Sequence, residues 1–77
     1  MNVNIPAVNK SHDFIVPSTM GIGKIICLMA LTISEEYGIA YKFEEAMLVD
    51  VHDNMVLNNN CSMKQMGIEN GAKLILI

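Results

Sequence analysis

The sequence contains no arginine, and its five lysines are scattered along the chain at positions 10, 24, 42, 64 and 73. Proteins that bind nucleic acid carry clustered basic side chains, because each phosphate contact needs a nearby positive charge. This chain has eight acidic residues and a net charge of −3 instead. The charge pattern therefore argues against a nucleic-acid partner.

Cysteines and long apolar runs are also scarce. Cys27 and Cys61 are the only two cysteines, whereas small secreted domains held by disulfides usually carry four or more. No uncharged run is longer than the ten residues from Ile25 to Ser34, about half of what a membrane-spanning helix needs. No basic N-terminus precedes an apolar run, so no signal peptide is visible. We therefore expect a cytoplasmic protein that does not insert into a membrane.

Hydrophobic residues are abundant and make up 52% of the 77 residues. A chain of this length forms one domain, which we place over residues 1–77. It buries roughly 60% of its unfolded surface, enough for one modest core. We expect no second domain and no internal repeat.

The apolar pattern predicts two strands, a long helix, two strands, a short helical turn and a last strand. The expected strands are 3–8, 12–16, 47–51, 55–57 and 73–77, and the expected helix runs from about 21 to 37. One helical face carries apolar residues at spacings of three and four, namely Ile22, Ile26, Met29, Ile33 and Tyr37. Gly38 is a natural stop for the helix. Pro6 lacks an amide donor and should lie at an edge or bulge.

One mixed sheet of about five strands packed on one long helix explains this order of elements. The helix carries the chain across the sheet, so that the last strand pairs beside the first, and such crossovers are right-handed. The sequence therefore predicts an α+β protein with the β-grasp arrangement.

Several short segments recur in the order and spacing of one superfamily. They are Pro17-Ser18 before the helix, Gly38-Ile39 after it, Ser62-Met63, Gly67-Ile68 and the closing Leu74-Ile75-Leu76. Through them the chain resembles the ubiquitin-like superfamily over nearly its whole length. The runs 53–57, 61–63 and 67–71 resemble the YukD/EsaB-like proteins, which are accessory proteins of Gram-positive type VII (ESX-like) secretion systems.

This resemblance implies a cytoplasmic, non-enzymatic protein that is not conjugated and that docks onto a larger machine. Its implied partner is a protein, such as a cytosolic domain of a membrane secretion component. The alternative function is that of a sulfur carrier or conjugated modifier, which needs a flexible tail ending in a glycine carboxylate. The sequence given ends instead at Ile77, within the last expected strand, so we disfavour that alternative.

Residues that could carry catalysis or bind a metal do not form a recognisable site. The candidate metal ligands His12, His52, Cys27 and Cys61 lack ligand spacing. The segment 21–24, Gly-Ile-Gly-Lys, resembles part of a phosphate loop but has neither the earlier glycine nor the following Ser or Thr. The adjacent acidic pairs 35–36 and 44–45 point in different directions. We therefore predict no catalytic residue, no metal and no cofactor.

The outward side of the expected helix is the first candidate contact surface. With Ile26 at the centre of the buried face, the opposite side carries Lys24, Leu28, Leu31 and Glu35. Because one sheet covers only one side of a helix, we predict that these two leucines contact another chain. That chain is a different protein or a second copy of this one.

The open face of the sheet is the second candidate. If Leu74 and Leu76 point into the core, Ile75 and Ile77 point outward by strand alternation. If Val49 and Val51 also point inward, Leu48 and Asp50 share the outer face. We therefore predict an outer apolar patch of Leu48, Ile75 and Ile77, of the kind that marks protein contacts.

Overall fold

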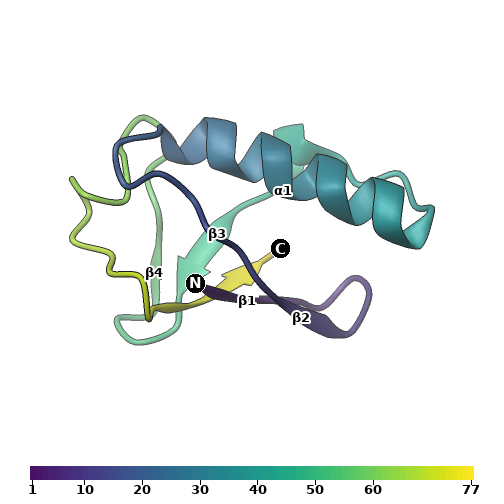
Figure 1. The fold of residues 1–77 in the computed structure, drawn as a ribbon, viewed down its shortest axis with the longest axis horizontal. Coiled ribbons are helices and arrows are strands. Elements are labelled where there is room, and N and C mark those ends of the chain that lie inside the picture. The colour runs from purple at the N-terminus through teal and green to yellow at the C-terminus, as the bar shows by residue number, and fades with distance from the viewer.

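The computed structural model describes all residues from Met1 to Ile77. A five-stranded sheet lies below one long helix (Figure 1). The strands are β1 (Asn2–Ile5), β2 (Lys10–Asp13), β3 (Leu48–Asp50), β4 (Met55–Val56) and β5 (Lys73–Leu76). The helix α1 spans Ile22–Tyr37, and a 3-10 helix, η1, spans Phe43–Glu45. The predicted order of strands and helix is confirmed.

The strands follow the spatial order β2-β1-β5-β3-β4. The first strand pairs in parallel with the last, while the other neighbouring pairs are antiparallel. A parallel pair needs a long crossover connection, and α1 lies within it. The predicted pairing of the last strand beside the first is therefore confirmed, and the β-grasp arrangement follows.

The hairpin at the N-terminus forms with shorter strands than the sequence predicted. Asn2 lies opposite Asp13, and Ile5 lies opposite Lys10. Pro6 follows directly after β1 and lies in the turn, not in the strand. The missing amide of Pro6 therefore leaves the sheet ladder of β1 intact, although β1 is an interior strand.

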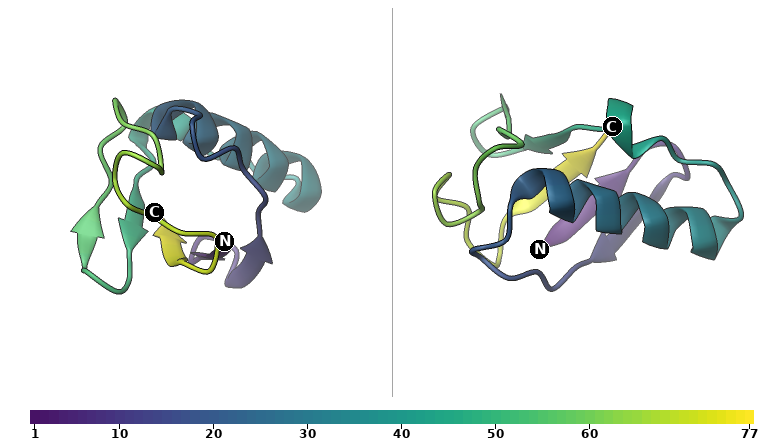
Figure 2. Two further views of the ribbon diagram at one scale, coloured as in Figure 1. Left: turned by 60° about the vertical axis from the view of Figure 1, so that its left-hand side comes forward. Right: turned by 90° about the horizontal axis from the view of Figure 1, so that it is seen from above.

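The core lies between α1 and the sheet. The predicted helical face is confirmed, because four of its members are at most 1% exposed and Tyr37 is half-buried. Ile25 and Ala30 widen this face. The helix ends at Gly38, which adopts the left-handed conformation with φ 64°. Figure 2 shows α1 crossing the sheet on one side only, with no helix on the opposite side.

The orientation predicted for β3 is wrong by one residue. Leu48 is fully buried and Asp50 is 5% exposed, whereas Val51 is 46% exposed. Leu48 lies opposite Leu76, and the two side chains point to the same face. Because Leu76 also belongs to the core, Leu48 must point toward α1.

The segment between β4 and β5 is held by local hydrogen bonds. The Ser62 amide donates to the Gln65 side chain, and the Gln65 amide donates to the Ser62 hydroxyl. This reciprocal arrangement is a capping box. The predicted helical turn at 63–66 forms as a hydrogen-bonded turn that is too short to be assigned as a helix. Met63 is fully buried beneath it, so the turn closes one end of the core.

Candidate protein-interaction surfaces

One half of the open sheet face is apolar. Its outward side chains come from three neighbouring strands and the residues that extend them. The apolar ones are Met47, Val49, Val51, Val56, Ile75 and Ile77, which we call the sheet patch. The exposed Lys73 of β5 points to the same side and lies beside Val51 at the edge of the patch. Val49 lies opposite both Val56 and Ile75, so these three form its centre. The patch is continuous across β4, β3 and β5.

The members of the sheet patch remain open to solvent because no layer covers this face. The exposed fractions are 43% for Met47, 46% for Val51, 53% for Val56 and 48% for Ile77. Val49 and Ile75 are half-buried by their neighbours on adjacent strands. An exposed apolar surface formed by adjacent strands is the type of surface that marks a contact with another protein.

The other half of the same face is polar. The Asn2 side chain donates a hydrogen bond to Asp13 at 3.4 Å, and the Asn4 side chain donates to Ser11 at 3.2 Å. These four residues lie on β1 and β2 and face the same side as Ile75. The open face is therefore divided into a largely apolar half and a polar half, and the charged Lys73 of β5 lies opposite Asn2 at their boundary.

The structure places only part of the predicted patch on this face. Ile75 and Ile77 point outward, as predicted, but Leu48 lies in the core and cannot contribute. Its place is taken by Val49, which the strand pattern had placed inside. The backbone groups of Met47 and Ile77 form a reciprocal pair of hydrogen bonds at 2.6 and 2.9 Å. That pairing extends the ladder and adds Met47 to the patch.

The outward face of α1 carries the four residues predicted there. Leu28 is 45% exposed and Leu31 is 55% exposed, and Lys24 and Glu35 are both exposed as well. The two ion pairs within the chain both involve histidines, so neither Lys24 nor Glu35 is paired. Figure 2 shows α1 on one side of the sheet only, so a stripe on its outward face and the sheet patch on the uncovered sheet face point away from one another.

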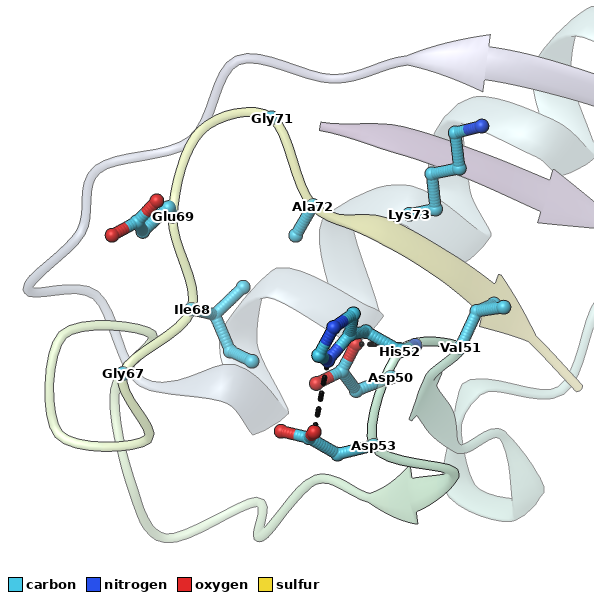
Figure 3. Close-up of a pocket in the computed structure, with 10 residues that line it drawn as sticks. All are labelled: Asp50, Val51, His52, Asp53, Gly67, Ile68, Glu69, Gly71, Ala72 and Lys73. Carbon is cyan, nitrogen blue, oxygen red and sulfur yellow. Dashed lines mark hydrogen bonds and ion pairs between the residues drawn. The ribbon is translucent and has the colours of Figure 1, made fainter.

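A pocket of about 610 Å³ lies beside the turn between β3 and β4. Figure 3 shows the Asp50 and Asp53 carboxylates and the His52 ring gathered on one side, with Ile68 opposite them. An oxygen of Asp50 accepts a hydrogen bond from the His52 amide at 3.1 Å. This bond explains how a carboxylate is accommodated at a buried position.

His52 is the side chain in this pocket with an altered pKa. Its Nδ1 donates a hydrogen bond of 2.9 Å to Asp53. That hydrogen bond and the negative charges of Asp53 and Asp50 raise the pKa of the His52 imidazole above its usual value. The pair is exposed to solvent, so its contribution to stability is screened.

A second histidine joins the hairpin to the helix. His12 and Tyr37 share a hydrogen bond of 2.6 Å between Nε2 and the phenol oxygen. Their rings are also in edge contact, with centroids 5.7 Å apart. Burial and the neighbouring Glu36 charge raise the pKa of the Tyr37 phenol. His12 therefore fastens β2 to the end of α1.

The four candidate metal ligands named from the sequence do not converge. No group of three or more His, Cys, Asp and Glu side chains lies close enough to hold a metal ion. Cys27 and Cys61 are both free and half-buried.

No helix is both long enough and apolar enough to cross a bilayer.

Comparison with known proteins rests on structure, because no protein-family model and no curated protein matches the sequence. The chain is similar to the N-terminal ubiquitin-like domain of the 4931431F19Rik protein, with a TM-score of 0.72 and 16% identity. That match covers 99% of this chain and 69% of the other. This chain has the ubiquitin-like fold.

Two further structures share the ubiquitin-like fold. One is a computationally designed protein based on human erythrocytic ubiquitin, with a TM-score of 0.69 and 19% identity over 100% of this chain and 86% of the other. The other is AtBAG1 in complex with HSP70, with a TM-score of 0.73 and 13% identity. The match covers 99% of this chain but only 37% of the AtBAG1 chain. At these identities the comparisons establish the fold alone.

Proposed function

We propose that this chain is an interaction module that binds another protein non-covalently through the sheet patch. The supporting observation is the apolar half of the open face, where Val49, Val56 and Ile75 meet without a covering layer. The buried centre of a protein interface is poor in charge and rich in apolar side chains. The polar half beside it supplies groups that can form the rim of such an interface.

We further propose that the partner is a cytosolic domain of a bacterial type VII secretion machine. The support for this finer role is the sequence resemblance of the runs 53–57, 61–63 and 67–71 to the YukD/EsaB-like proteins. On this proposal the module is an accessory or regulatory component. AtBAG1, whose structure was determined with HSP70 bound, is an example of this fold within a protein that binds another protein.

The test of the proposal is affinity purification from the native organism with the wild-type chain and a patch variant. Val56→Asp places a charge in the patch at a side chain that is 53% exposed, so the fold should tolerate it. Ser11→Asp is the matched control, because it adds the same charge at an exposed position on β2, the edge strand farthest from β3 and β4 on that side of the sheet. The wild type and Ser11→Asp should recover the same partner, and Val56→Asp should lose it.

The identity of the partner tests the finer role. Recovery of a secretion-machine component, followed by binding of the purified pair, supports it. Recovery of an unrelated protein by the same patch contradicts the secretion role but retains the interaction module. Equal recovery with Val56→Asp, or a partner attached by a covalent bond that survives denaturing electrophoresis, contradicts non-covalent binding through the patch.

A further inference from the structure

The outward stripe of α1 has a regular spacing. Lys24, Leu28, Leu31 and Glu35 follow one another at intervals of four, three and four residues. At about 100° per residue, all four lie within an arc of about 60° on the helix surface. This is the spacing that keeps side chains along the seam between two packed helices.

The charges at the ends of this stripe are unfavourable for the helix that carries them. The amino end of a helix is the positive end of its dipole, and the carboxyl end is the negative end. Lys24 nevertheless lies in the first turn and Glu35 in the last, and the helix has no acidic residue in the first turn and no basic residue in the last. Neither side chain has an ion-pair partner within the chain.

A second copy of the helix, packed in antiparallel orientation, places Lys24 and Glu35 near helix ends of the opposite polarity. A two-fold axis midway between Met29 and Ala30 places Lys24 opposite Glu35 of the other copy. The same axis places Leu28 opposite Leu31 of the other copy, because both pairs are centred on the same point of the sequence. Each charge then lies near the helix end that attracts it.

We propose that two copies of this chain associate through antiparallel packing of their α1 helices. The two leucines of each copy meet at the centre of the contact, and the Lys24–Glu35 pairs close its two ends. The contact is isologous, as in the commonest symmetric dimers. The occupant is a second copy because the stripe is complementary to itself in both charge and position.

We expect this dimer to be weak because the contact between the two helices is small. The complementary stripe extends over 11 residue steps, or about 16 Å of helix. Stable interfaces bury about 1,200–2,000 Å², and two short helical stripes bury less. We therefore expect a dissociation constant in the micromolar to millimolar range, roughly 10 µM to 1 mM, and a dimer that forms at high local concentration.

The proposal does not depend on the function assigned to the sheet patch. The stripe faces away from the sheet, and the patch lies on the sheet face that α1 does not cover (Figure 2). Both contacts can therefore form at the same time. Loss of the helix contact should leave partner binding through Val56 intact, and Val56→Asp should leave the dimer intact.

The experiment is sedimentation velocity of the whole chain, at about 0.15 M salt and concentrations up to about 1 mM. The variants are Lys24→Glu, Glu35→Lys and the two changes combined. Each single change sets like charges opposite one another twice in the dimer and should weaken association about tenfold or more. The combined variant restores both pairs and the net charge, but it places each charge near the partner helix end that repels it. It should therefore associate more strongly than either single variant and no more strongly than the wild type.

An equimolar mixture of the two single variants gives the sharpest readout. Opposite charges then meet only between unlike copies, so the mixture should associate where each variant alone does not. Lys64→Glu is the control for net charge, since this exposed residue lies outside the helix. Its association should match that of the wild type.

Two further measurements separate a lost contact from a lost fold. Each single change improves the fit of a charge to its own helix dipole, so the melting temperature of the monomer should not fall. The double change Leu28→Asp and Leu31→Asp should abolish association, both in the wild-type background and when it is added to the two single charge variants that are mixed. A wild type that stays monomeric up to about 1 mM overturns the proposal, as does a mixture that associates no better than its components.

Discussion

The neighbouring residues Leu48 and Val49 should respond very differently to truncation. The structure places the Leu48 side chain in the core, opposite Leu76. It places Val49 on the open face at the centre of the sheet patch, where it is half-buried. Substitution of each residue by alanine therefore tests the orientation of β3 and the location of the proposed interface.

The expected magnitudes differ by several-fold. Leu48→Ala removes a fully buried side chain, and such changes cost about 2–5 kcal/mol because they leave a cavity. Val49→Ala removes two methyl groups from a half-buried position, and we expect a loss of about 1 kcal/mol from cross-strand contacts. A domain of this length has roughly 4–12 kcal/mol of total stability. The first change therefore removes a large part of it.

Urea denaturation followed by circular dichroism measures both losses on one scale. For a small domain, each 1 kcal/mol corresponds to about 4–8 °C in melting temperature, so Leu48→Ala should melt more than about 8 °C below the wild type. Leu48→Met is the control, since it keeps the volume and should cost less than about 1.5 kcal/mol.

The opposite ranking refutes the orientation. If Val49→Ala is the more costly change and Leu48→Ala is mild, β3 presents Leu48 to the solvent, as its alternating pattern alone had indicated. Val49 would then lie in the core and not in the sheet patch, and the proposed interface would be contradicted. A partner that binds Val49→Ala as tightly as the wild type also contradicts the central place given to Val49.

Three other outcomes follow from local geometry. Ser62→Ala should lower the free energy of unfolding by about 1 kcal/mol, because the Gln65 amide loses its hydrogen-bond acceptor. A urea denaturation midpoint equal to that of the wild type would contradict this expectation. Gly38→Ala should cost about 1–2 kcal/mol, because alanine is strained at this left-handed position, and Gly38→Asn should cost less. Asp53→Asn should lower the pKa of His52 toward about 6.5 in an NMR titration. Because the folded-state pKa of His52 is raised, its stabilising effect is present below about pH 6.5 and is lost as the pH rises through the folded-state pKa. The difference in stability between wild type and Asp53→Asn should therefore shrink as the pH rises above about 6.5, and a difference that does not change with pH argues against this pair.

The elements of this fold were predictable from local pattern. Apolar residues at helical spacing identified α1, and Gly38 marked its end at the observed position. The pairing of β5 beside β1 followed from the order of the elements and the need for a crossover. Strand ends were predicted less well, because Pro6 ends β1 earlier than the apolar pattern indicated.

The orientation of β3 was not predictable from the strand itself. The run Leu48-Val49-Asp50-Val51 alternates in a way that fits two opposite orientations. One orientation buries two valines, and the other buries a leucine and an aspartate. Burial of an aspartate is unfavourable unless its carboxylate is hydrogen-bonded, and here the carboxylate of Asp50 accepts a hydrogen bond from the His52 amide in the following turn. A local signal was present, since an aspartate two residues before a turn amide is typical of an Asx-turn.

The sequence by itself determined the helix, the number of strands and the side of α1 that faces outward. Those features depend on contacts between residues close in the chain, so the spacing of apolar residues along the sequence shows them directly. Only the tertiary structure decided which side chains of β3 form the sheet patch. That choice depends on the register of Leu48 against Leu76, a pairing between distant segments. A shift of one residue exchanges the two faces of a strand, so the composition of the proposed interface was fixed by the packing of the whole domain.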